Sequence, residues 1–247
     1  MTAPDSGTGP CALVFLVRHG QAAVPDAEGR YFSKTPVPLT PAGEQHAALA
    51  GELLREAGVE TIWASDLLRA RQTAEIISAA TAVPVAYDRR LREVDCGHLD
   101  GSRVEDLERE HPAFLPWIAS GYRQGFAASD HLDAGLVFPG GESVVTAAER
   151  TIPAFQQIST ASAGRCVAIV SHAWVTAAII CHVLRIPVDH YYRFGMANAG
   201  VSLVRAGADG RGMLDALNLS VPLQALAGGA LPLRERAAHR KGGLSGR

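Results

Sequence analysis

Short apolar runs that alternate with helical patterns constrain this chain more than any other feature of its sequence. Buried strands are expected at residues 12–17 (ALVFLV), 61–64 (TIWA) and 166–170 (CVAIV), and a weaker strand at residues 83–87. Helical patterns occupy the intervals between them. One begins at Thr40 and Pro41 and stops at Gly58, and others cover residues 67–80, 142–158 and 173–184.

This alternation predicts an α/β fold, a three-layer α/β/α sandwich with a mainly parallel central sheet. A hairpin over residues 200–205 and 213–217 is expected to end it. The length of 247 residues fits one large domain. We place that domain at residues 11–226, between a lead-in (1–10) and a tail (227–247) that both have the composition of disordered segments. Residues 88–138 are the least regular part and are predicted to form a lid or specificity region.

The composition excludes several classes of function. A net charge of −2 and a pI near 6.5 predict neither a nucleic-acid groove nor attraction to an anionic membrane. The four cysteines are far apart, which favours a reduced cytoplasmic setting over a disulfide framework or a zinc site. No secretory signal is expected at residues 1–10. Residues 166–184 are apolar over nearly a membrane-spanning length, but a strand that runs into a helix explains them better.

Polar residues follow three of the predicted strands. They are Arg18 and His19, residues 65–69, and Ser171 with His172. Parallel sheets bind ligands at the carboxyl ends of their strands, so these groups should meet at one edge. A neutral imidazole such as that of His19 can attack phosphorus, and Arg18 can hold phosphoryl oxygens. Gly20 would let the backbone approach a ligand closely. A histidine at a strand end is nevertheless more often a structural hydrogen-bonding group.

Several ordered segments within residues 13–203 resemble the histidine phosphatase superfamily, which contains the cofactor-dependent phosphoglycerate mutases and many small-molecule phosphatases. The matching segments are residues 16–21 (LVRHGQ), 39–45 (LTPAGEQ), 65–75 (SDLLRARQTAE), 91–101 (LREVDCGHLDG), 139–143 (PGGES) and 169–172 (IVSH). The resemblance implies a phosphoglycerate mutase-like fold.

The resemblance also implies roles for individual residues. His19 would be the phosphorylated nucleophile, and Arg18, Arg69 and His172 would bind the phosphoryl group, with His172 as a cationic donor that the substrate dianion keeps protonated. Otherwise, Arg69 would be a solvent-facing helix residue and His172 a core histidine.

Glu93 is the general acid and base that the resemblance nominates, and Asp95 is its competitor in the same loop. An alkoxide leaving group needs a proton, so the pKa of this carboxyl group must be raised by partial burial and by the neighbouring phosphate. The mechanism requires no metal or other cofactor, and we find no metal-binding or P-loop motif.

The chain also departs from the family pattern. Many members carry Ser or Thr and then Asn where this chain has Ala22 and Pro25, and Ala173 replaces the usual Gly. Ala22 and Pro25 remove two candidate polar contacts to the phosphate and weaken a mutase assignment, whereas Ala173 is a small change that could tighten the pocket. We therefore expect a phosphomonoesterase acting on a small phosphorylated metabolite. Phosphoglycerate mutase-type transfer is the alternative, and a non-catalytic phospholigand-binding module is the alternative of another class. An exposed edge strand could pair two copies into a homodimer.

Overall fold

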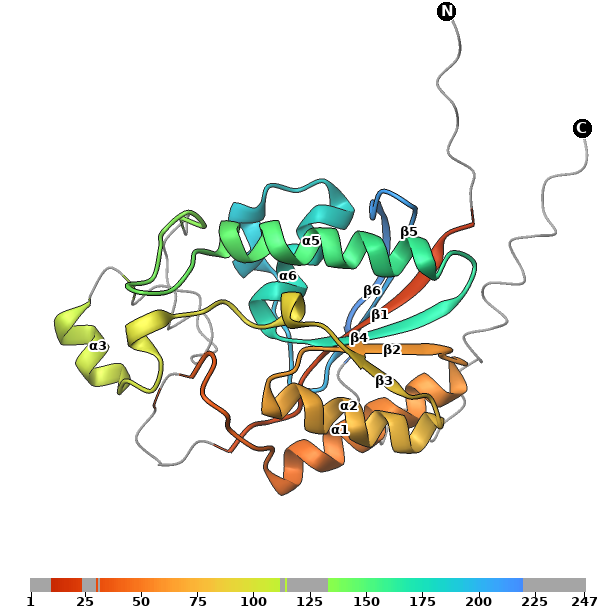
Figure 1. Ribbon diagram of the computed structural model, residues 1–247, viewed down its shortest axis with the longest axis horizontal. Coiled ribbons are helices and arrows are strands. Elements are labelled where there is room, and N and C mark those ends of the chain that lie inside the picture. Colours follow the sequence, from red (N-terminus) through yellow and green to blue (C-terminus); the bar gives the residue numbers. More distant parts are fainter. Residues whose placement is uncertain (1–9, 24–29, 31, 112–113, 115–132, 220–247) are drawn as a thin grey trace, which may run out of the picture.

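The structure is a computed structural model that describes residues 10–23, 30, 32–111, 114 and 133–219. Its centre is a sheet of six strands in the order β3-β2-β4-β1-β5-β6 (Figure 1). The strands are β1 (Ala12–Arg18), β2 (Thr61–Ala64), β3 (Val85–Tyr87), β4 (Cys166–Ser171), β5 (Val201–Ala206) and β6 (Gly212–Leu219).

Strands β3, β2, β4 and β1 are parallel to one another, whereas β5 pairs antiparallel with β1 and β6 pairs antiparallel with β5. The predicted mainly parallel sheet is therefore confirmed. The register pairs Arg18 at the end of β1 with Ser171 at the end of β4. The two strands thus end at the same level, and the residues that follow them must emerge together.

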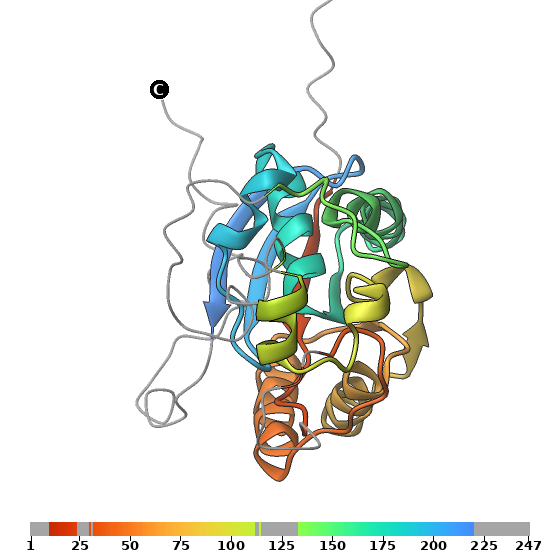
Figure 2. The same ribbon diagram turned by 90° about the vertical axis from the view of Figure 1, so that its left-hand side faces the viewer.

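Helices cover both faces of the sheet and complete the predicted three layers (Figures 1 and 2). The two pairs are α1 (Pro41–Glu56) with α2 (Leu68–Thr81), and α5 (Val144–Ala161) with α6 (Ala173–Leu184). Side chains alternate along a strand, so β1 serves two cores. Phe15 and Val17 join the core under α1 and α2, while Val14 and Leu16 join the core under α5 and α6.

Helix starts show where local side-chain chemistry decides a boundary. Thr40 caps α1, as expected, because its hydroxyl accepts from the Gly43 N–H at 2.9 Å. Helix α2 begins one residue later than predicted, after Leu67, and has no side-chain cap. Helix α5 begins two residues later than predicted, because the Ser143 hydroxyl accepts from the Thr146 N–H.

The irregular region contains short helices, as predicted: η1 (Arg89–Leu91), η2 (Gly97–Leu99) and α3 (Val104–Glu110). A further short helix, η4 (Val188–Arg193), follows α6. Figure 1 shows α3 at one end of the molecule, beyond the sheet. Most of the predicted lid past residue 111, the tail and nearly all of the lead-in lie outside the described residues.

The apolar segment at residues 166–184 is β4 followed by α6, as the sequence predicted. None of the helices in the described part of the chain combines the length and the apolar character needed to cross a bilayer.

Candidate active site

The ends of β1 and β4 bring two histidines together. The backbone N–H of His19 donates to the backbone carbonyl of Ser171 at 2.9 Å, which continues the strand pairing by one residue. The imidazole rings of His19 and His172 then lie 5.1 Å apart between centroids, at an interplanar angle of 58°. Both side chains are buried, with 7% and 0% of their surface exposed. The predicted meeting of these residues at the sheet edge is what the structure shows.

The surroundings of His19 define its protonation state. Its Nδ1 lies 2.7 Å from the Gly20 carbonyl oxygen, which can only accept, so Nδ1 carries a proton. Burial holds the pKa of His19 well below its usual value, and the positive charges of Arg69 and Arg18 lower it further. The ring is therefore neutral near pH 7, and its lone pair is on Nε2.

One arginine contacts this lone pair, and the charge of a second acts on the same ring. Arg69, in the first turn of α2, is only 4% exposed and donates from Nε to His19 Nε2 at 3.2 Å. Its Nη2 donates to the Ser33 carbonyl at 2.6 Å, which fixes the guanidinium. Arg18 donates from Nη1 to the Met196 carbonyl at 2.5 Å. Arg69 is thus a buried site residue, and the solvent-facing alternative is wrong.

His172 is held by a chain of hydrogen bonds through Ser65. The Leu67 N–H donates to Ser65 Oγ at 3.3 Å, and this hydroxyl lies 2.8 Å from His172 Nε2. The pKa of His172 is lowered well below its usual value by burial and then by nearby charges, of which Arg69 contributes most. The free site therefore holds a neutral ring. The other ring nitrogen, Nδ1, is buried and makes no hydrogen bond within the described residues.

Glu93 lies at the same edge, in the loop between η1 and η2. Its carboxylate accepts from the backbone N–H of Val94 at 3.1 Å and of Trp174 at 3.4 Å. The protein packed around this carboxyl group raises its pKa, and this effect exceeds the lowering by these N–H groups and by Arg69 and Arg18. The sequence argument required a raised pKa for the general acid, and burial of Glu93 raises its pKa in the absence of a bound phosphate.

Asp95, the competing carboxylate, has other partners. It forms an ion pair with Lys34 at 3.1 Å, and its Oδ1 accepts from the Gly97 N–H at 2.8 Å. Its side chain is 37% exposed. These contacts make Asp95 a structural residue of the loop and leave Glu93 as the carboxylate near the histidines.

Ser65 was expected at this edge among residues 65–69, but Ser33 and Thr73 were not predicted from the sequence. Ser65 and the Ser33 carbonyl hold His172 and Arg69, and the Thr73 hydroxyl accepts from the Gly20 N–H at 3.0 Å. A Cβ on Gly20 would lie 2.4 Å from the Gly43 carbonyl oxygen, so the missing side chain accommodates α1.

The positions that depart from the family pattern have ordinary structural places. Ala22 forms an isolated antiparallel bridge with Leu39, and Ala173 is the first residue of α6. Pro25 lies outside the described residues.

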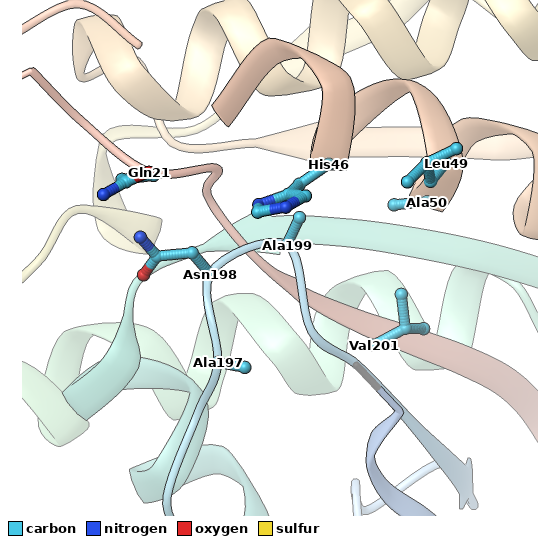
Figure 3. Close-up of a pocket in the computed structure, with 8 residues that line it drawn as sticks. All are labelled: Gln21, His46, Leu49, Ala50, Ala197, Asn198, Ala199 and Val201. Atoms are coloured by element: carbon cyan, nitrogen blue, oxygen red, sulfur yellow. The ribbon is translucent and has the colours of Figure 1, made fainter. Parts of the chain in front are cut away.

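A separate pocket of about 330 Å³ lies between α1 and the loop before β5 (Figure 3). Figure 3 shows the amides of Gln21 and Asn198 at one end of it and Leu49, Ala50 and Val201 at the other. None of the predicted site residues lines it. Among residues 10–23, 30, 32–111, 114 and 133–219, we find no group of three or more His, Cys, Asp or Glu residues that could hold a metal ion.

Comparisons with known proteins agree with this geometry. The sequence profile of the histidine phosphatase superfamily (branch 1) matches residues 14–219. A probable phosphoglycerate mutase, GpmB, of Salmonella paratyphi B is 31% identical over 191 residues, which cover 77% of this chain and 83% of that protein.

Solved structures show the same fold. A mycobacterial glucosyl-3-phosphoglycerate phosphatase is 26% identical, with a TM-score of 0.71, and the match covers 85% of this chain and 99% of that one. A putative alpha-ribazole-5'-P phosphatase from Escherichia coli is 21% identical with a TM-score of 0.71 over 85% of this chain and 97% of that one, and shows the fold alone. The profile match spans most of the chain, and the predicted resemblance is confirmed: the chain belongs to the histidine phosphatase superfamily.

Proposed function

We propose that this protein is a phosphomonoesterase that hydrolyses a small phosphorylated metabolite through a phosphohistidine on His19. One observation carries the proposal: a buried, neutral histidine whose Nε2 lone pair lies beside the Arg69 guanidinium, with Glu93 at the same sheet edge. Nucleophile, cation and proton donor are the parts that phosphoryl transfer to an enzyme requires.

The first step forms a bond between His19 Nε2 and phosphorus and breaks the bond between phosphorus and the ester oxygen. An incoming phosphoryl group displaces the hydrogen bond from Arg69 Nε to this nitrogen. The raised pKa of Glu93 favours its protonated form, which gives its proton to the departing oxygen. In the second step the Glu93 carboxylate takes a proton from water, which attacks phosphorus and releases phosphate and neutral His19.

Cationic and neutral donors complement the charge of the transferring group. Arg18 and Arg69 supply positive charge, and Nδ1 of His172, to which no other described residue is hydrogen-bonded, is a donor when the ring is cationic. Negative charge in the site raises the pKa of a neighbouring histidine, so a bound phosphate dianion favours the cationic form of His172 that the sequence predicted.

Phosphatase activity on a small ester is supported by the mycobacterial glucosyl-3-phosphoglycerate phosphatase, which has also been solved with inorganic phosphate, at 26% identity and a TM-score of 0.70 over 84% of this chain and 97% of that one. Phosphoglycerate mutase-type transfer is the second candidate, because the GpmB relative carries that name. Ala22 argues against it, since a mutase needs polar groups to hold a second phosphoryl group.

The test is release of inorganic phosphate from p-nitrophenyl phosphate and from a panel of phosphorylated metabolites. We expect hydrolysis by the natural protein and none above background by His19→Ala. His46→Ala, which changes an exposed histidine on α1, is the matched control and should keep full activity. Full activity in His19→Ala would exclude the proposal. Interconversion of the two phosphoglycerates without phosphate release would favour the mutase.

A further inference from the structure

The loop that carries Glu93 is held by a turn from a distant part of the chain. The His98 N–H donates to the Pro139 carbonyl at 2.8 Å, and the Glu142 N–H donates to the Asp95 carbonyl at 2.9 Å. The two backbones approach so closely that a Cβ on Gly141 would lie 2.1 Å from the Asp95 carbonyl oxygen. Residues 139–143 therefore pack closely against the loop between η1 and η2 that carries Glu93, which we call the acid loop.

Arg150 of α5 binds the same loop through its carbonyl groups. Its Nη1 donates to the carbonyl oxygens of Arg90 and Arg92 at 2.7 and 2.8 Å. Its Nη2 donates to the carbonyl oxygen of Glu93 itself at 3.0 Å. One side chain thus holds the backbone on both sides of the residue that we propose as general acid.

Glu142 completes the arrangement. Its Oε1 accepts from Arg150 Nη2 at 2.5 Å and from the Asp95 N–H at 3.0 Å, and its Oε2 accepts from Arg150 Nε at 3.1 Å. The two side chains are 24% and 17% exposed. Arg150 therefore binds the backbone carbonyl of Glu93, and Glu142 binds the backbone N–H of Asp95.

We propose that Arg150 and Glu142 are positioning residues for the acid and base step: they fix the backbone of Glu93 and so set where its carboxyl group meets the leaving oxygen. This inference rests on the proposed function. Proton transfer requires heavy atoms at hydrogen-bond distance, so a small displacement of the loop weakens it. Neither residue contacts the reacting atoms, and both act through Glu93.

The contacts call for arginine in particular. A guanidinium is a planar fork that can donate to several acceptors at once, whereas a lysine ammonium is a compact charge without that geometry. Arg150→Lys therefore removes most of the backbone contacts but keeps the positive charge, which also helps to lower the pKa of His172. This substitution separates positioning from electrostatics.

The experiment is a double-mutant cycle with Arg150→Lys and Glu93→Gln, measured on an alkyl phosphate and on p-nitrophenyl phosphate. General acid catalysis is worth roughly 100- to 10,000-fold, and we expect Arg150→Lys to lower kcat/KM, which reports the first step, on the alkyl ester by about 10-fold or more. The loss on the aryl ester should be much smaller, because its leaving group needs little protonation. In the Glu93→Gln background, Arg150→Lys should change neither rate, since both substitutions remove the same effect.

Glu142→Gln keeps the shape of the partner and provides a second variant, for which we expect the same preference for the alkyl ester. Arg165→Lys is the control, because Arg165 forms an exposed ion pair with Glu60 away from the acid loop. Equal losses on both esters, or an undiminished loss in the Glu93→Gln background, would overturn the positioning role. If the natural protein hydrolyses neither ester, the proposed function fails instead.

Discussion

Burial moves the pKa values of the site's acid and nucleophile in opposite directions. It disfavours the charged form of any group, so it lowers the pKa of His19 and raises the pKa of Glu93. A neutral imidazole and a protonated carboxyl group are the forms that the first step needs. The same low-dielectric setting therefore prepares both residues for their proposed roles.

The leaving group decides how much the proton of Glu93 matters. For an alkyl phosphate, kcat should be high below the raised pKa of Glu93 and should fall as pH rises through it, because the acid loses its proton. Glu93→Gln should remove this fall and slow the alkyl ester more than p-nitrophenyl phosphate. Steady-state rates across pH for both esters check this, and equal losses on both would argue against the acid role.

Among single residues, the sequence identified the five side chains of the candidate site but not how each is held in place. The predicted His19, Arg18, Arg69, Glu93 and His172 meet at one edge of the sheet. Ser65 and Ser33 had no signal beyond their positions, because a hydroxyl or a carbonyl that orients a neighbour depends on how distant segments pack. Ser33 and Arg69 are 36 residues apart along the chain.

Among the elements, the strands were predicted best and the turns worst. Continuous apolar runs define β1 and β4 because both faces of these strands are largely buried, whereas in β2 only Ile62 and Ala64 are buried. The close packing of the turn at residues 139–143 against the acid loop was not predictable. Glycines in a sequence indicate a turn, but they do not show which other segment of backbone packs where their side chains are missing.

Gly141→Ala tests that packing. A new Cβ 2.1 Å from the Asp95 carbonyl must push the two loops apart, which should lower the free energy of unfolding by about 1–3 kcal/mol and reduce activity on alkyl esters. Urea unfolding provides the measurement. Gly195→Ala is the matched control, because nothing lies within 4 Å of a Cβ built there. Equal stability of the two variants would contradict the close packing.

For the whole molecule, the alternation of elements predicted three layers and a mainly parallel sheet. The alternation does not predict the strand order, in which β1 lies between β4 and β5, two strands from the second half of the chain. Strand β6 forms one edge of the sheet and exposes Met213, Leu217 and Leu219. The homodimer expected at such an edge remains a prediction.

The buried histidines make stability depend on pH. His19 and His172 have folded pKa values below the unfolded value of about 6.5, so the folded state binds fewer protons. Stability should therefore be full above pH 6.5 and fall as pH drops toward the lowered values, by up to about 1.4 kcal/mol per pH unit for each histidine. Urea unfolding at pH 7.5 and 5.5 should show a smaller fall for His172→Gln than for the natural protein, whereas His46→Gln should match the natural protein. An identical fall in His172→Gln would contradict this account.

The covalent intermediate is the central claim, and trapping it is the most direct test. The protein is mixed with a radiolabelled aryl phosphate, quenched within one turnover, and digested for mass spectrometry. We predict an acid-labile, alkali-stable phosphoryl group on His19, more of it in Glu93→Gln if water attack is slowed, and none in His19→Ala. Turnover without any label on His19, or label on another residue, would contradict the mechanism.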